Sequence, residues 1–351
     1  MAATSSSPLT PTGIGLSEGV AESPGASTRG APGAMGALEL VEEEMRRVEI
    51  ALTARMESPI GRIPEVGAHL LQAGGKRLRP LLAVLAARAT DAPIDLAIAV
   101  GVAGELIHTA TLYHDDVVDD GRVRRGRPAA RMIYGNGIVV LVGDFCLARA
   151  LETVALTGSL GAVQSLAATV TEMAEGEVAQ LERAGNPDAT VEDYFRVIDR
   201  KTASLIAWCA RVGGGAGAAA DAALDRYGRA LGRAFQIADD VLDCAGDATT
   251  AGKSVGQDIQ EGKLTLPVLY ACESDAKLRV LVRDKVGENA VSPADAATIL
   301  AATRAAGGVE RARAKARELT ITARQELGVL QPSRFRDALA SLATHSADRK
   351  S

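Results

Sequence analysis

The sequence contains few aromatic residues and few cysteines. Of its 351 residues, one is tryptophan, five are tyrosine and four are phenylalanine, and the four cysteines lie far apart with no CxxC pair. This cysteine usage excludes a zinc ribbon and a disulfide scaffold, and it is typical of a protein from a reducing compartment. We therefore expect a cytoplasmic location.

Long apolar runs and a strong charge of one sign are also missing. No uninterrupted apolar run reaches the ~18 residues that a membrane-spanning helix needs. The start carries no basic stretch followed by an apolar one, so neither secretion nor a stable membrane anchor is expected. The 39 basic and 44 acidic residues give a formal charge of −5. No face is obliged to be basic, which argues against a nucleic-acid partner.

The composition divides the chain into two parts. Residues 1–36 consist mainly of Ser, Thr, Pro, Gly and Ala, and they are predicted to be disordered because they cannot bury enough apolar surface to offset their ordering entropy. Residues 37–351 are predicted to form one all-α domain, since apolar residues recur there with the helical period. After a first segment that begins at Leu38, the period is found over 95–113, 138–156, 160–181, 191–211, 221–243, 264–272 and 295–328.

Two clusters of aspartates stand at the ends of two apolar helical segments. They consist of Asp115, Asp116 and Asp119, and of Asp239, Asp240 and Asp243. The negative end of a helix dipole and like charges four residues apart both disfavour acids at such positions. A divalent cation removes this conflict, because Mg²⁺ is typically held by one or two carboxylates plus substrate phosphates. The clusters therefore favour a site for Mg²⁺ and a diphosphate over the alternative, a solvated acidic face.

Basic residues are available for the remaining phosphate charge. Arginine can make two parallel hydrogen bonds to a phosphate, whereas lysine acts as a point charge. Such residues follow the Gly74–Gly75 pair, follow the first aspartate cluster and recur later in the chain; they include Lys76, Arg79, Arg124, Arg125, Lys201, Lys253 and Lys263. Taken singly, each has ordinary surface charge as its alternative.

The order of these motifs resembles that of the trans-type polyprenyl diphosphate synthases. The matching segments are GGKRLRP (74–80), HTATLYHDDVVDD (108–120), GDFCLARA (143–150), RKTASL (200–205), FQIADDVLD (235–243) and GKSVGQDIQEGK (252–263). The resemblance covers residues 70–270 closely. It implies a large helical bundle around a central cavity, a homodimer, and a Mg²⁺-dependent prenyltransferase that acts on isopentenyl diphosphate and an allylic diphosphate.

The resemblance also implies a role for each site residue. The six aspartates would bind about two or three Mg²⁺ ions together with the allylic diphosphate. The residues implied to bind isopentenyl diphosphate are Lys76, Arg79, His108 and Arg125. Those implied to bind the allylic diphosphate are Arg124, Lys201, Thr202, Gln236, Lys253 and Lys263. Asp115, Asp119, Lys201 and Asp239 would be catalytic, because they stabilise the leaving diphosphate as the allylic C–O bond ionises.

Product length is expected to depend on residues that precede the first cluster. Thr111 and Ala110, four and five residues before Asp115, are both small. In the family, aromatic residues here stop growth at short products, so the resemblance implies an all-trans product of about C30 to C50. The alternatives are a short-chain synthase, with products of about C15 to C20, and a catalytic or non-catalytic subunit of a heteromeric synthase. Complete aspartate clusters argue against a non-catalytic subunit.

Two other protein classes fit the sequence less well. A terpene cyclase also ionises allylic diphosphates, but its second metal motif is of the Asn/Asp-Ser/Thr-Glu type, unlike Asp239–Asp243. A carboxylate-bridged di-iron bundle needs paired Glu-x-x-His motifs, and Glu105 with His108 supplies one half-site. Glu175, Glu177 and Gln180 resemble the family's E-G-E-x-x-Q segment, and they are interpreted either as site residues or as interior hydrogen-bonding residues.

Overall fold

The computed structural model describes residues 34–71, 75, 77–124, 126–215, 217–246, 256–287 and 289–347. Three predicted site residues, Lys76, Arg125 and Lys253, lie outside the described residues, as do residues 1–33 of the segment predicted to be disordered. The first helix begins at Ala34, and the described residues belong to one compact unit.

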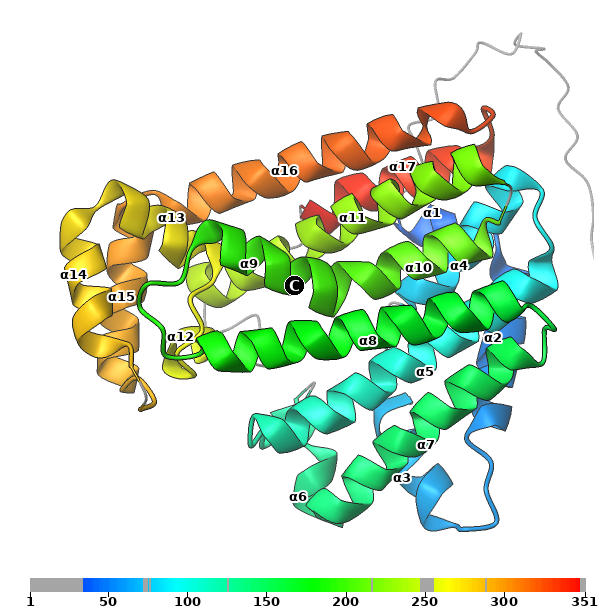
Figure 1. Cartoon of the computed structure of the whole chain (residues 1–351), viewed down its shortest axis with the longest axis horizontal. Coiled ribbons are helices and arrows are strands. Elements are labelled where there is room, and N and C mark those ends of the chain that lie inside the picture. Colours follow the sequence, from blue (N-terminus) through cyan, green and yellow to red (C-terminus); the bar gives the residue numbers. More distant parts are fainter. Residues whose placement is uncertain are drawn as a thin grey trace, which may run out of the picture. The chain divides into compact units, whose positions relative to one another are not determined.

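Helices account for almost all regular structure in this part of the chain (Figure 1). Their bounds are α1 (Ala34–Glu39), α2 (Glu42–Arg55), α3 (Arg62–Leu71), α4 (Leu78–Thr90), α5 (Ile94–Val118), α6 (Ala130–Tyr134), α7 (Asn136–Ala155), α8 (Leu160–Arg183), α9 (Val191–Ile198), the π-helix η1 (Asp199–Ala203), α10 (Ser204–Gly213), α11 (Ala218–Ala245), α12 (Gln257–Gln260), α13 (Leu266–Ser274), α14 (Ala276–Lys285), α15 (Pro293–Ala305), α16 (Gly308–Glu326), the 3₁₀-helix η2 (Leu327–Val329) and α17 (Arg334–Ala347). Two short antiparallel strands, β1 (Val123–Arg124) and β2 (Arg127–Pro128), complete the described elements. The prediction of an all-α fold is confirmed.

Two of the segments predicted to be continuous helices are interrupted. Segment 191–211 contains the π-helical turn η1 between α9 and α10. Segment 295–328 is divided at Gly307, whose φ of +75° lies in the left-handed region. Glycine adopts this conformation without a steric cost, and it commonly follows the last turn of a helix. The helical period alone did not show either interruption.

Helix α5 carries the first aspartate cluster through the middle of the bundle. It packs against α2, α4, α7 and α10. Its apolar residues occupy all of its sides, which is typical of a fully packed helix. By length and composition α5 is also apolar enough to cross a membrane, although it contains no uninterrupted apolar run of that length; 72% of its most apolar window is buried inside the protein. Here α5 serves as a core helix.

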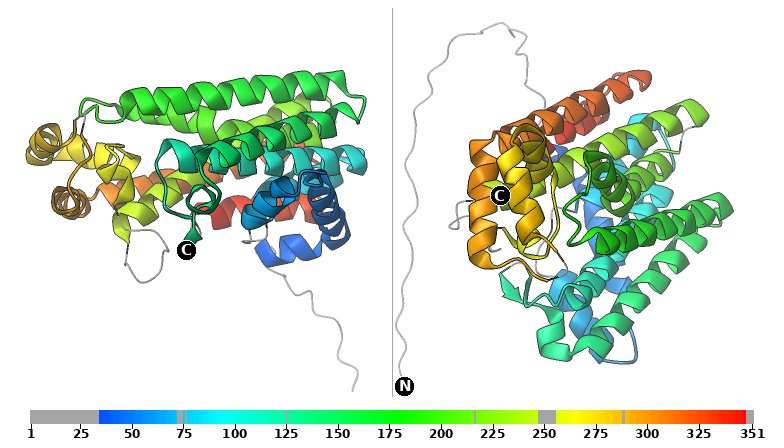
Figure 2. Two further views of the ribbon diagram at one scale, coloured as in Figure 1. Left: turned by 90° about the horizontal axis from the view of Figure 1, so that it is seen from below. Right: turned by 60° about the vertical axis from the view of Figure 1, so that its left-hand side comes forward.

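The buried side chains form two hydrophobic cores, and α11 belongs to both. The first core gathers α4, α5, α7 and α10, with Leu224 and Leu231 contributed by α11. The second core gathers α13, α14, α15 and most of α16, with Ile237 and Val241 from the later turns of α11. Helices α13, α14 and α15 lie at one end of the bundle (Figures 1 and 2). The two aspartate clusters are therefore supported by different cores.

Candidate active site

The two aspartate clusters face a common cavity. Its volume is about 1040 Å³, and most of its walls come from α5, α8, α9, η1, α11 and the segment 257–265. Asp115 and Asp119 line it from the end of α5, while Asp239 and Asp240 line it from α11. The fold thus brings together carboxylates that are more than a hundred residues apart in the sequence.

Burial and neighbouring charges act on the first cluster. Burial raises the pKa of Asp115 to about 6; Lys201 opposes this rise, and Glu177 adds to it. Asp119 accepts a hydrogen bond from Lys263 Nζ at 3.2 Å through its Oδ1. Since burial disfavours an ionised carboxylate, a further cation beside Asp115 would stabilise its charged form.

Asp116 lies behind the cavity and does not line it. Its side chain is fully buried. Its Oδ1 accepts a hydrogen bond from Arg124 Nε at 2.8 Å and forms an ion pair with Arg124 Nη2 at 2.6 Å. Its Oδ2 has no hydrogen-bond partner among the residues that the structure describes. Arg124 itself lines the cavity, so Asp116 orients a cationic side chain of the site.

The second cluster is held by hydrogen bonds from neighbouring helices. Asp240 accepts from Tyr194 Oη at 2.5 Å and from Gln236 Nε2 at 2.9 Å. Burial raises the pKa of Asp240 to about 7, although these two hydrogen bonds oppose the rise. Asp243 is absent from the described cavity wall; its Oδ1 accepts from the backbone N–H of Gln257 at 3.2 Å and so ties α11 to α12.

All of the described side chains predicted to bind the two diphosphates line the cavity; they are Arg79, His108, Arg124, Lys201, Thr202, Gln236 and Lys263. Lys201 forms an ion pair with Glu177 of α8. Lys263 pairs with Glu261 at 2.7 Å and with Asp119. Burial alone would lower the pKa of Lys263, but these two carboxylates raise it overall. Both lysines are therefore held at the cavity by carboxylates.

Some lining side chains were not identified from the sequence. Tyr194 lies 46 positions from its partner Asp240, so no local spacing connects them. Glu261 stands two residues before Lys263 inside a matching motif, and this proximity was a usable signal. Glu177 and Gln180, whose role the sequence left open, line the cavity. Glu175 contacts Arg200 at 3.7 Å instead.

Part of the cavity wall is apolar. It includes Leu112, Leu147, Val170 and Met173, with Thr111 among them. Ala110 is fully buried in the first core and is not part of this wall. The predicted influence of Thr111 and Ala110 on product length stays a prediction, and Thr111 is the better placed of the two.

The carboxylates suit a metal ion that arrives with phosphate. Among the described residues, no three His, Cys, Asp or Glu side chains lie close enough to hold a metal ion on their own. Mg²⁺ usually takes one or two carboxylates and completes its shell with water and substrate phosphate. Asp115, Asp119 and Asp239 offer such carboxylates on one cavity.

Comparison with known proteins assigns the chain to a family. The model of the polyprenyl synthetase family matches residues 61–303. The chain belongs to this family. It is 39% identical over 319 residues to octaprenyl diphosphate synthase of Escherichia coli, with 89% of this chain and 97% of that relative covered.

Solved structures of polyprenyl synthetases share the fold over most of the chain. A polyprenyl synthase from Caulobacter crescentus, crystallised with calcium and isoprenyl diphosphate, matches with a TM-score of 0.87 and 38% identity, covering 92% of this chain and 100% of that one. A decaprenyl diphosphate synthase from Rhodobacter capsulatus matches with a TM-score of 0.84 and 39% identity, covering 90% and 98%.

Family membership establishes the type of activity. The chain is an enzyme, a prenyltransferase, as its motifs predicted. The names of these relatives favour a long-chain polyprenyl diphosphate over a short-chain product. The terpene cyclase and the di-iron protein are set aside.

Proposed function

We propose that this prenyltransferase joins isopentenyl diphosphate to an allylic diphosphate, with Mg²⁺ held by Asp115, Asp119 and Asp239. One observation carries the proposal: carboxylates from α5 and α11 line the same cavity as the cations predicted to bind diphosphate. Mg²⁺ bound here with the allylic diphosphate would act as a Lewis acid toward its oxygens. The sequence also predicted Asp116, Asp240 and Asp243 as metal ligands, and this stays a prediction. From their contacts with Arg124, Tyr194 and the Gln257 backbone, we propose that these three aspartates mainly hold their neighbours in place.

Cationic side chains of the cavity stabilise the leaving group. Lys201 and Lys263 are held by carboxylates in this structure, and we propose that they turn to the allylic diphosphate, joined by Arg124. Charge develops on the diphosphate as the allylic C–O bond breaks, and preorganised cations in a water-poor site favour that transition state. Thr202 donates to Gln236 Oε1 at 3.0 Å, which keeps these two polar side chains together beside the lysine.

Isopentenyl diphosphate is proposed to bind against Arg79 and His108. Its double bond supplies the electron pair for the new carbon–carbon bond with the allylic cation. A proton is then lost from the adduct, with the released diphosphate as its acceptor, and a new trans double bond forms. No nucleophilic serine or cysteine is needed. The product is again an allylic diphosphate, so that the next condensation uses the same groups.

The apolar part of the wall suits the growing hydrocarbon. Leu112, Val170 and Met173 line the cavity together with the small side chain of Thr111, and we propose that the tail lies against these residues, out of contact with water. Burying each added methylene contributes about 0.8 kcal/mol. We propose an all-trans product of about C30 to C50.

A homodimer is part of the proposal, since α7 and its flanks leave apolar side chains in solvent. Ile138 and Leu141, three residues apart on one face of α7, are 39% and 64% exposed, and neighbouring exposed apolar side chains mark interaction surfaces. Light scattering after gel filtration should give twice the mass of one chain. Leu141→Asp should lower that mass to one chain, and a monomeric wild-type protein would reject this part.

The activity is tested with purified protein, isopentenyl diphosphate, Mg²⁺ and allylic primers of different length. Chromatography of the dephosphorylated products should show a ladder that ends in a long all-trans alcohol. Chelation of the metal with EDTA should stop elongation. Failure to elongate any primer would reject the proposal. Turnover that begins only after a second chain is added would favour the heteromeric synthase.

A further inference from the structure

The π-helical turn η1 carries two of the predicted diphosphate ligands. It spans Asp199–Ala203 and separates α9 from α10. A π-helix has more residues per turn than an α-helix, so consecutive side chains diverge by a smaller angle, and such turns are rare and often lie at functional sites. Lys201 and Thr202 are neighbours in the sequence, and both line the cavity. This wide turn is an unusual conformation that its surroundings must maintain.

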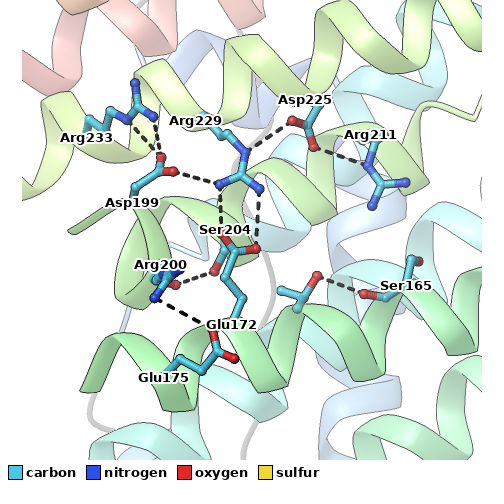
Figure 3. A network of polar contacts seen from close by, with 11 residues as sticks. Ser165, Glu172, Glu175, Asp199, Arg200, Ser204, Arg211, Asp225, Arg229 and Arg233 are labelled. Atoms are coloured by element: carbon cyan, nitrogen blue, oxygen red, sulfur yellow. Dashed lines mark hydrogen bonds and ion pairs between the residues drawn. The ribbon is translucent and has the colours of Figure 1, made fainter. Parts of the chain in front are cut away.

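Two arginines donate hydrogen bonds to the first residue of the turn. Asp199 Oδ2 accepts from Arg229 Nη1 at 3.0 Å, and Asp199 Oδ1 accepts from Arg233 Nε at 2.8 Å (Figure 3). Both arginines lie on α11, one helical turn apart, and the following turns of α11 carry Gln236 and Asp239. These bonds set the register of η1 against the helix that bears the second aspartate cluster.

The same network extends to α8. Arg229 also donates to Glu172 Oε1 at 3.1 Å, and Arg200 contacts Glu175 at 3.7 Å (Figure 3). Asp199, Arg229 and Arg233 are absent from the described cavity wall. Their side chains are 23%, 29% and 34% exposed. Removal of one member of the network would leave the remaining partly buried charges with fewer ion-pair partners.

Glycines bring the neighbouring helices into backbone contact with η1. A Cβ added at Gly176 of α8 would lie 2.7 Å from the backbone nitrogen of Lys201. One added at Gly232 of α11 would lie 2.6 Å from Ala203 Cα. Real Cβ atoms do not approach other atoms so closely. The turn is therefore enclosed on two sides, and its ionic bonds select one register within that space.

We infer that Asp199, Arg229 and Arg233 are positioning residues for the allylic diphosphate: they hold the π-helical turn in the register that presents Lys201 and Thr202 to the cavity. The inference rests on the proposed function, in which these two side chains bind that substrate. Arg79 and His108, proposed to bind isopentenyl diphosphate, come from α4 and α5. A substitution in the network should therefore weaken binding of the allylic diphosphate more than binding of isopentenyl diphosphate.

The kinetic test uses Asp199→Asn and Arg233→Gln, with KM measured for each substrate at saturating Mg²⁺. Loss of one charge-assisted hydrogen bond is expected to raise KM for the allylic diphosphate about tenfold, while KM for isopentenyl diphosphate stays within about twofold. Arg233→Lys keeps a cation beside Asp199 and should recover most of the loss. Arg211→Gln is the matched control, because Arg211 pairs with Asp225 at 3.3 Å in the same network (Figure 3).

Hydrogen exchange tests the positioning of η1 independently of the proposed prenyltransferase reaction. Backbone amides of residues 199–203 should exchange about tenfold faster in Asp199→Asn than in the wild type and stay protected in Arg211→Gln. This measurement needs no turnover, so an inactive wild type would reject the proposed function while the exchange rates still decide on the positioning of η1. Equal rises in both KM values, an equal effect of Arg211→Gln, or unchanged exchange would overturn the inference. Should Asp199→Asn not fold, Arg233→Gln leaves Asp199 bonded to Arg229 and permits the same comparison.

Discussion

At the scale of single residues, the adjacent aspartates Asp115 and Asp116 differ in what they contact. Asp115 lines the cavity, whereas Asp116 is fully buried and bonded to Arg124. We predict that Asp115→Asn lowers kcat by about a hundredfold or more, since it removes a carboxylate proposed to hold the Mg²⁺ that stabilises the leaving diphosphate. It should leave Tm unchanged, because burial already disfavours the charge of that carboxylate. Asp116→Ala should instead cost about 3 kcal/mol of stability. Steady-state kinetics and thermal unfolding of both variants check this, and equal Tm losses would contradict it.

Two buried tyrosines allow a similar comparison. Tyr194 Oη donates to Asp240 and Tyr113 Oη donates to the Val66 carbonyl, both at 2.5 Å. Phenylalanine at either position leaves an acceptor short of one hydrogen bond, which costs about 1 to 3 kcal/mol. Only Tyr194→Phe should also lower kcat, because Asp240 lines the cavity and the Val66 carbonyl lies outside its described wall. A normal kcat for Tyr194→Phe, measured well below its Tm, would show that the hydrogen bond from Tyr194 to Asp240 is not needed for catalysis.

Two neighbouring residues of α5 are predicted to differ in their effect on product length. Thr111 lines the cavity, whereas Ala110 is packed in the first core. Thr111→Phe should fill the path of the tail and shift the product to shorter chains, as seen by chromatography of the dephosphorylated alcohols. Ala110→Phe should mainly lower stability, by about 1 to 3 kcal/mol, because it overpacks a dense core. Shortening by Ala110→Phe alone would reverse this assignment.

The polar residues of the site were largely predictable because the sequence places unfavourable charges at recognisable spacings. Acids at the end of an apolar helix, such as Asp115 and Asp119, need an explanation beyond stability, and the order of the motifs supplied the basic partners. Only one of the two hydrogen-bond partners of Asp240 could be predicted from the sequence. Gln236 lies four residues away on the same helix face, but Tyr194 is brought in by the packing of α9 on α11, which no spacing encodes.

At the scale of the elements, the approach of α11 to η1 depends on Gly232. Its missing side chain lets the helix reach Ala203 at backbone contact. We predict that Gly232→Ala destabilises the protein by about 2 kcal/mol or more, because backbone atoms cannot rotate away as side chains can. Gly161→Ala in the first turn of α8 is the control, since nothing lies within 4 Å of its Cβ position. The control should be neutral or stabilising by up to about 1 kcal/mol. Equal Tm values for the two variants would contradict the close contact.

The helices themselves followed from the apolar period, but η1 did not. Residues 191–211 keep a helical pattern throughout, because a single wide turn shifts the later apolar residues by only one position. The features that stabilise the turn lie on other helices, in Arg229, Arg233 and the two glycines. A local conformation that is selected by tertiary contacts has no local signature, and it is often found where function needs it.

At the scale of the whole molecule, the site depends on two cores that share α11. Asp115 belongs to α5 of the first core, and Asp239 belongs to the part of α11 that packs on the second. Separate movement of the cores would pull the aspartate clusters apart. Because the apolar side chains of α11 pass from one core to the other without a break, the described cores are expected to unfold together.

This expectation can be measured with one cavity-creating substitution in each core. Leu106 is buried in the first core and Ile299 in the second, and truncation of either to alanine should cost about 2 to 5 kcal/mol. Calorimetry of the wild type should show one transition, and Leu106→Ala and Ile299→Ala should each move that whole transition to a lower temperature. Binding of Mg²⁺ with inorganic pyrophosphate should raise the Tm of all three proteins by a similar amount, since the ligand is proposed to bind both aspartate clusters. Two separate transitions, each moved by one substitution only, would show that the cores unfold independently and that α11 does not couple the halves of the site.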